Sequence, residues 1–168
     1  MNIQERKKTK LLTLDSLINE FDSITADVHK LCAEYFSEKL VARKYGIIYE
    51  AEDKTYARYT DLQIRISAYI RKLEQLSTQE NLEKLYNENK LASSVSDTDL
   101  SRKDAVSGLN ELGRMYKHCK DREEKEYLQN VKDAYKNAIN TLIRMVTRLL
   151  EQNDKEALLR GKDFSYLE

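Results

Sequence analysis

Apolar side chains return every three or four residues through the first part of the chain, from about Lys10 to Lys44. Two interleaved series with a seven-residue spacing carry this pattern: Leu14, Phe21, Val28 and Tyr35, and Leu17, Ile24 and Leu31. Such a repeat places both series on one face of an α-helix, as in the seam of a coiled coil. Further apolar residues broaden the stripe: Leu11, Ile18, Cys32, Phe36 and Leu40. The width of the stripe predicts a helix that packs in a bundle.

A second apolar stripe runs from about Ile47 to Leu76, again with steps of three and four residues. Its main members are Tyr59, Leu62, Ile66, Tyr69, Leu73 and Leu76. Gly46 separates the two stripes and can adopt the left-handed conformation that ends many helices. The alternative is one continuous helix through Gly46, at a cost of roughly 1 kcal/mol. We favour the break, which predicts a long antiparallel hairpin.

The segment after Leu76 has mixed signals for helix and loop. Ser77 and Glu80 have the spacing of a capping box, so a new helix begins there or the second helix continues. Residues 92–100 are small and polar, and they predict a loop because such side chains compete for backbone hydrogen bonds.

The last third of the chain predicts a second helical pair. Ser101 is the expected start of its first helix, and an all-charged stretch, "KDREEKE", separates the two. Asp154 is expected to cap a short C-terminal helix that Gly161 closes. The predicted organisation is a helical hairpin over 1–91, a polar loop over 92–100, and the second pair with its short C-terminal helix over 101–168, in the same domain.

The composition agrees with long helices. The chain has no proline and only four glycines, and 35% of its residues are charged, which is typical of helical and coiled-coil proteins. The predicted fold class is all-α, an elongated helical bundle with a long antiparallel coiled-coil-like hairpin. Seams of this length often exceed what one chain can cover, so we expect a homodimer.

The charge balance narrows the choice of partners. Basic and acidic residues number 29 each, which disfavours broad electrostatic binding to nucleic acid or to anionic membranes. We expect no membrane insertion, because no apolar run of about 18 residues occurs. The basic start lacks a following apolar region, so no signal peptide is expected. Two cysteines in such a chain indicate free thiols in the cytoplasm.

Two histidine–cysteine pairs are the candidates for metal binding. His29 and Cys32 share a helix face, and two such pairs could complete a tetrahedral zinc site. His118 and Cys119 are adjacent, however, and point about 100° apart on a helix. We therefore favour core thiols beside half-exposed histidines, and we expect no metal and no cofactor.

The stretch around His29 weakly resembles histidine phosphotransfer domains, in which an apolar residue follows the phosphoaccepting histidine two positions on. Leu31 holds that position here. The family's following lysine and glycine are replaced by Cys32 and Ala33. An ordinary surface histidine is the favoured interpretation.

Gly108 and Gly113 have the glycine spacing of a phosphate-binding loop. Arg114 and Met115 stand where that loop needs lysine and serine or threonine, and the helical period continues through the segment. Small residues that allow close contact between helices are the favoured interpretation.

The stretch from Ser101 to Tyr116 resembles the recognition helix of helix-turn-helix regulators. The resemblance implies that Ser101, Arg102 and Lys103 begin a helix and reach base edges in DNA. The long preceding loop departs from the short turn of that family. DNA binding is therefore the alternative function.

Tyrosine and arginine, which are enriched at protein interfaces, gather in the second stripe. The candidate partner-binding residues are Tyr45, Tyr49, Arg58, Arg65, Phe164 and Tyr166. The residues show no catalytic triad and no activated nucleophile. The predicted function is a non-enzymatic helical protein–protein interaction module, an adaptor, regulator or assembly factor that self-associates.

Overall fold

The computed structural model describes residues 14–49, 53–89 and 94–159, which form helices without any strand. The helices are α2 (Leu14–Lys44), α3 (Asp53–Leu76), α4 (Gln79–Asn89), α5 (Ser94–His118) and α6 (Arg122–Leu159). The prediction of an all-α fold is confirmed. None of these helices combines the length and the apolar run needed to cross a membrane.

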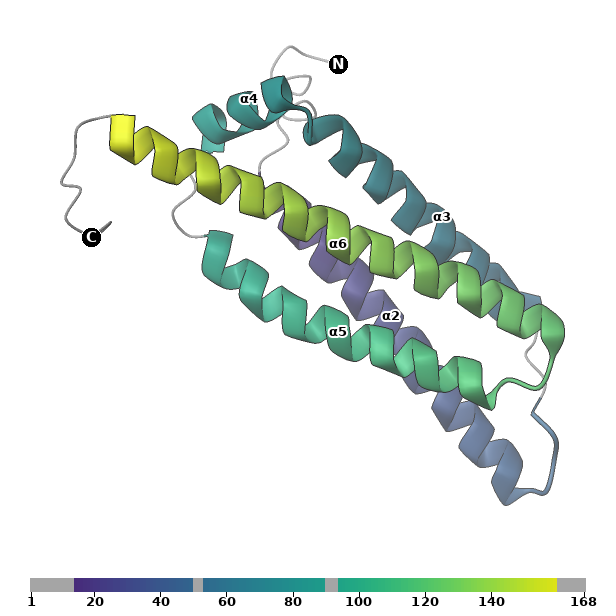
Figure 1. Cartoon of the computed structure of the whole chain (residues 1–168). Coiled ribbons are helices and arrows are strands. Elements are labelled where there is room, and N and C mark those ends of the chain that lie inside the picture. The colour runs from purple at the N-terminus through teal and green to yellow at the C-terminus, as the bar shows by residue number, and fades with distance from the viewer. Residues whose placement is uncertain (1–13, 50–52, 90–93, 160–168) are drawn as a thin grey trace, which may run out of the picture.

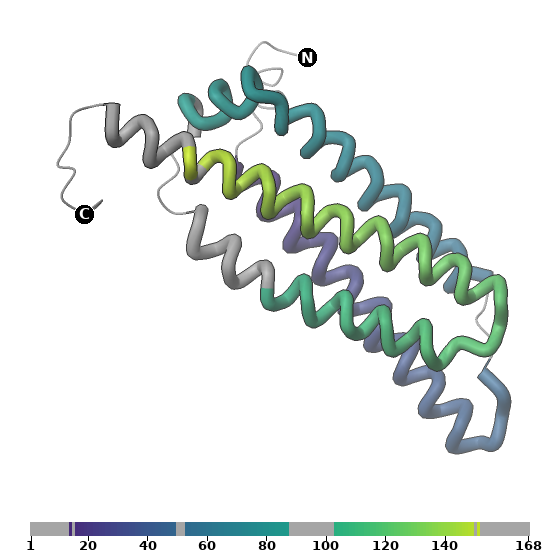
Figure 2. Tube along the Cα trace, viewed as in Figure 1, coloured from purple at the N-terminus to yellow at the C-terminus, as the bar shows by residue number. Residues whose placement is uncertain are grey.

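The four long helices lie side by side as an elongated bundle, with α4 across one end (Figure 1). Helices α2 and α5 run toward the end that holds the α2–α3 and α5–α6 turns, and α3 and α6 return from it (Figure 2). The main contacts join α3 to α6 and α2 to α5, and α5 also packs on α6. Contact between α2 and α3 is slight, so the coiled-coil-like pairing of the first two helices is not confirmed.

The apolar stripes predicted from the sequence meet in one core. Every member of the two seven-residue series in α2 is buried, and so are five of the six listed members of the α3 stripe. From α6 the core receives Leu128, Val131, Tyr135, Ala138, Leu142, Met145 and Leu149. Burial of these side chains is the main stabilising term of the bundle.

Several tyrosines lie deep in this core. Tyr69 is buried and its hydroxyl donates a hydrogen bond to the Leu17 carbonyl oxygen at 2.7 Å. Tyr135 is buried as well, and its hydroxyl lies 3.0 Å from Thr25 Oγ1. Phe21 stacks at 6.0 Å from both rings. The hydroxyls of Tyr69 and Tyr135 are therefore satisfied inside the protein, so these two rings can sit at the centre of the bundle.

Gly46 ends α2, as expected. Its φ is 66°, its N–H donates to Arg43 O at 3.1 Å, and Ile47 N–H donates to Ala42 O at 2.9 Å. These two bonds form a Schellman motif, which needs a residue with positive φ after the helix. The second helix begins at Asp53 instead of about Ile47, because Ile47 is still bonded to the end of α2.

The start of α4 is shifted by one residue from the expected capping box. Thr78, not Ser77, caps the helix, since Asn81 N–H donates to Thr78 Oγ1 at 3.4 Å. The Ser77 hydroxyl donates instead to Glu74 O at 2.8 Å, at the end of α3. The helix α4 is therefore separate from α3.

Helix α5 begins at Ser94, so the prediction of a polar loop is wrong for residues 94–100. Serine and aspartate are favoured in the first turn of a helix as well as in loops, which explains the error. Ser101, the expected helix start, lies well inside α5.

The expected short C-terminal helix is also wrong, because α6 continues through Asp154 to Leu159. No proline or glycine interrupts residues 122–159. An interior aspartate costs a helix at most about 0.7 kcal/mol relative to alanine, which is too little to end α6 at this position.

The two glycines of α5 offer a test of helix packing. A Cβ on Gly108 would lie 3.2 Å from Tyr135 Oη and 3.3 Å from Val28 Cγ1, whereas a Cβ on Gly113 would meet nothing within 4 Å. We predict that Gly113→Ala raises the free energy of unfolding by about 0.5–1 kcal/mol through helix propensity. Gly108→Ala should lower it by about 1 kcal/mol, because the hydrogen-bonded Tyr135 must shift.

Urea unfolding followed by circular dichroism measures both variants. Equal stabilisation by the two substitutions would contradict the close contact of α5 with α2 and α6 at Gly108.

Candidate functional site

Three ion pairs connect α2 to α3, and we call them the charge ladder. Lys72 Nζ lies 3.0 Å from Glu20 Oε2, Arg65 pairs with Asp27, and Arg58 pairs with Glu34. The acidic residues on α2 are seven positions apart, as are the basic residues on α3. Each pair is partly exposed, so each contributes only about 0.2–1 kcal/mol. The charge ladder therefore sets the register of the two helices more than it stabilises them.

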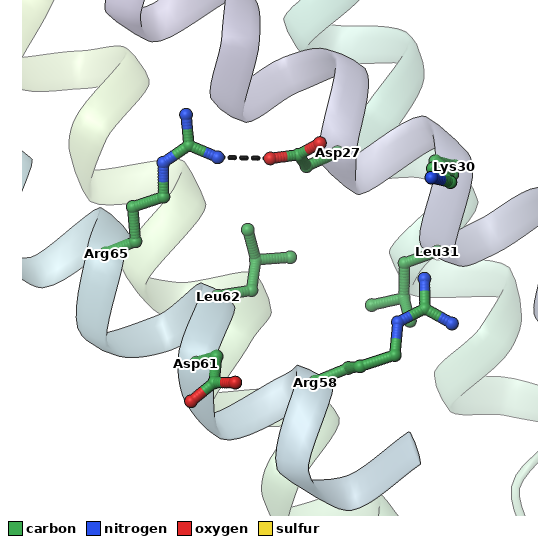
Figure 3. Close-up of a pocket in the computed structure, with 7 residues that line it drawn as sticks. All are labelled: Asp27, Lys30, Leu31, Arg58, Asp61, Leu62 and Arg65. Carbon is green, nitrogen blue, oxygen red and sulfur yellow. Dashed lines mark hydrogen bonds and ion pairs between the residues drawn. The ribbon is translucent and has the colours of Figure 1, made fainter. Parts of the chain in front are cut away.

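A groove of about 290 Å³ opens between the same two helices (Figure 3). Its lining comprises Asp27, Lys30, Leu31, Arg58, Asp61, Leu62 and Arg65. Leu31 and Leu62 are buried, while the charged side chains surround them in the close-up. Cations and anions are mixed around the groove, which gives it no clear preference for one class of ligand.

The far end of α2 carries a patch of exposed apolar side chains, which we call the tip. Leu40, Val41, Tyr45, Ile47 and Ile48 are between 54% and 83% exposed. The end of α2 projects past the end of α5 (Figure 1), so no neighbouring helix covers it. The prediction that Leu40 belongs to the core stripe is wrong for this reason. Exposed apolar patches of this kind mark interaction surfaces in soluble proteins.

Charges of both signs surround the tip. Arg43 and Lys44 occupy the last turn of α2, and with Leu40 and Val41 they line a hollow in the surface. Glu38 and Asp53 are exposed close to the tip in the sequence. The surface is therefore amphipathic, with neither charge dominant.

A polar cluster lies where α2 meets the α5–α6 turn. Lys39 Nζ donates to His118 O at 2.6 Å and to Tyr35 Oη at 3.2 Å. Tyr35 Oη lies 3.7 Å from Cys119 Sγ, which in turn donates to Met115 O at 3.1 Å. The Lys39 ammonium thus caps the carbonyl end of α5.

Glu124 is the unexpected member of this cluster. It lies in the first turn of α6, yet only 4% of its surface is exposed. Its Oε1 atom and the hydroxyl of Tyr59 are buried without a hydrogen-bond partner. Burial raises the pKa of the Glu124 carboxyl, and the Cys119 thiol and the Lys39 ammonium act in the opposite direction. The sequence places Glu124 in an all-charged stretch, which gave no signal that this carboxyl is buried.

The two thiols are poor nucleophiles in this setting. Both cysteines are free and buried. Burial raises the pKa of the Cys32 thiol to about 12 and that of the Cys119 thiol to about 12. Because the thiolate is the reactive form, neither cysteine is poised for nucleophilic chemistry at neutral pH.

The histidines are also engaged in structural contacts. His29 Nδ1 lies 3.0 Å from Glu111 Oε2, and its Nε2 lies 3.1 Å from Asp104 O. The His118 ring packs edge-on to Phe36 at 6.2 Å. Over the described ranges, no group of three or more histidine, cysteine or acidic residues could hold a metal ion.

The candidate partner-binding residues fall into separate places. Tyr45 is 69% exposed and belongs to the tip, whereas Tyr49 is half-buried and its hydroxyl donates to Glu38 at 3.1 Å. Arg58 and Arg65 belong to the charge ladder. Phe164 and Tyr166 lie outside the described residues. Sequence reasoning placed Leu40 in the core and Ile48 on the second helix, so it missed most of the tip.

The proposed DNA-reading residues do not begin a helix. Ser101, Arg102 and Lys103 lie more than a turn inside α5, which starts at Ser94. Base contacts from the first residues of a recognition helix require that start. The helix-turn-helix resemblance therefore loses its structural basis.

No protein-family model, curated protein or solved structure matches the chain.

Glu124 gives a pH-dependent prediction. Because its pKa is raised in the folded protein, folding binds its proton more tightly, and stability falls as pH rises from the ordinary glutamate pKa through the raised one. We predict that Glu124→Gln raises the free energy of unfolding at pH 8 by on the order of 1 kcal/mol, and that the gain shrinks toward pH 4.

Denaturant unfolding at several pH values measures this difference. The exposed neighbour variant Glu123→Gln is the control and should leave the pH dependence of wild type unchanged. If the stability of Glu124→Gln depended on pH as that of the wild type does, the claim that burial destabilises the ionised Glu124 carboxylate would be contradicted.

Proposed function

We propose that the chain is a non-enzymatic helical interaction module, an adaptor, regulator or assembly factor, and that it self-associates through the tip. The exposed apolar side chains at the end of α2 are the observation that carries this proposal. Transfer of one such side chain from water to an interface contributes about 1.5–3 kcal/mol. Five of them in one patch are enough to hold a modest interface.

The charges around the tip favour a second copy as its occupant. A two-fold interface must be self-complementary, because the same patch meets itself. Arg43 and Lys44 in the last turn of α2 supply positive charge, and the exposed Glu38, one turn before Val41 on the same helix, supplies negative charge. A basic or acidic partner would meet repulsion from one half of this surface.

The other parts of the proposal rest on the chemistry of the side chains. The buried thiols with raised pKa support a non-enzymatic role, and free cysteines suit the reducing cytoplasm. The seven-residue spacing of the charge ladder supports a coiled-coil-like pairing of α2 with α3, of the kind in which flanking charges set orientation.

Light scattering coupled to size exclusion tests the self-association. We predict that the wild-type chain is a dimer. Leu40→Glu or Ile48→Glu should raise the dissociation constant of this dimer by at least about tenfold, because each places a buried charge where an apolar side chain made contact. Ile64→Glu is the matched control, since Ile64 is 58% exposed on α3 outside the tip.

Ile64→Glu should leave the dimer intact. Two outcomes would remove the proposal. In one, the wild-type chain is monomeric at every concentration measured. In the other, Ile64→Glu dissociates the dimer as much as the tip variants do.

A further inference from the structure

Helix α2 is the first described helix of the chain. Its main packing partner is α5, while α3 packs mainly on α6. Between α2 and α3 lie the charge ladder and the groove on the surface (Figure 3), and beneath them the buried contact of Tyr69 with Phe21 and Leu17. The only covalent link from α2 to the rest of the described bundle is the turn at the tip, which begins at Gly46.

We propose that two copies of the chain exchange α2, so that α2 of each copy packs on α3 and α5 of the other. This inference rests on the proposed self-association and names its mode. Every contact that α2 makes inside one chain is then remade between chains, which is the general reason that exchange of an identical element is a low-cost route to a dimer.

The charge ladder is suited to such an exchange. Its three pairs are partly exposed, so breaking them during opening costs little, and they re-form in the same register with α3 of the partner. The buried contacts of α2 with α3 also re-form in the exchanged dimer. These include the hydrogen bond from the Tyr69 hydroxyl to Leu17 O and the stacking of Phe21 on Tyr69.

The turn has the properties of a hinge. Gly46 holds a positive φ of 66°, and a Cβ there would meet nothing within 4 Å. Opening the hairpin changes the backbone at this residue without disturbing any packed side chain next to it. The adjacent apolar residues Tyr45, Ile47 and Ile48 lack cover in the closed chain, and exchange brings the two turns of a dimer together, where these residues cover each other.

Complementary charge reversal distinguishes exchange from simple docking of two closed chains. One variant carries Glu20→Lys, Asp27→Arg and Glu34→Arg on α2. The second carries Arg58→Glu, Arg65→Asp and Lys72→Glu on α3. Each variant alone places three like-charge pairs between α2 and α3, in a closed chain and in an exchanged homodimer alike.

Mixing the two variants restores opposite charges only if the helices pair between chains. In an exchanged heterodimer, the basic α2 of the first variant meets the acidic α3 of the second, and the two unchanged helices also meet as a matched pair. We expect a mixture refolded together to give a heterodimer by native mass spectrometry, with a melting temperature several degrees above that of either variant alone.

A mixture that keeps the melting temperatures of its separate components overturns the exchange. If the wild-type dimer still depends on Leu40 and Ile48 in that case, the proposed self-association stands and only its mode is wrong. A single chain with all six reversals is the control, and it should regain wild-type stability because its ladder is complementary in either arrangement.

A second variant covers the case in which the reversed chains fail to fold. Gly46→Ala destabilises the left-handed turn of the closed hairpin. The dissociation constant of its dimer should therefore be about tenfold lower than that of the wild type. An unchanged or weakened dimer in this variant overturns the role of the turn as the hinge of the exchange.

Discussion

Stacking of Phe21 against Tyr69 and Tyr135 is the contact on which the rest of the bundle depends. It joins α2 to α3 and α6 in the middle of the core, with ring centroids 6.0 Å apart on both sides. Aromatic rings bury much apolar surface and prefer defined geometries, so they fix the distance between helices. The hydroxyls of both tyrosines find partners on α2, at Leu17 O and Thr25 Oγ1. One helix is thereby held by ring packing and by hydrogen bonds together.

The same arrangement explains why polar chemistry gathers at the turn end. Four polar groups lie together at this end of the bundle: the Lys39 ammonium, the Cys119 thiol, the Tyr35 hydroxyl and the Glu124 carboxyl. A buried polar atom without a partner costs about 1–3 kcal/mol. Among the described residues two such side-chain atoms occur, on Glu124 and Tyr59, and Glu124 lies next to the α5–α6 turn, at the same end of the bundle as the tip.

Local periodicity was sufficient to predict which helix faces are buried. The stripes of α2 and α3 become core almost residue for residue, and the break at Gly46 follows from the lack of a Cβ where φ is positive. Helix ends were harder to predict, because Ser94, Thr78 and Asp154 are residues that suit caps, loops and helix interiors within about 1 kcal/mol.

The residues of the candidate site were harder to predict than the core, because their environment depends on distant helices. Leu40 was assigned to the broad edge of the α2 stripe, five positions after Tyr35 and outside both seven-residue series, yet it lies in solvent, where α2 extends past the end of α5. Coverage of a side chain depends on the length of a neighbouring helix more than 50 positions away in the sequence, which no local pattern encodes. Two sets of charged residues with a seven-residue spacing are visible in the sequence: Glu20, Asp27 and Glu34, and Arg58, Arg65 and Lys72. They can be matched as ion pairs only once α2 and α3 are known to lie antiparallel to each other.

The exposed tip and the slight contact between α2 and α3 have one common cause. The core is built mainly from the pairs α2–α5 and α3–α6, which the packing of α5 on α6 joins, so α2 and α3 need only slight direct contact. A helix that is longer than its partner then projects from the bundle with its apolar stripe uncovered. Exposure of these apolar side chains to water is unfavourable, and the proposed contact with the same patch of a second copy would remove part of that cost. The uncovered apolar end of α2 is therefore the feature on which the proposed self-association depends.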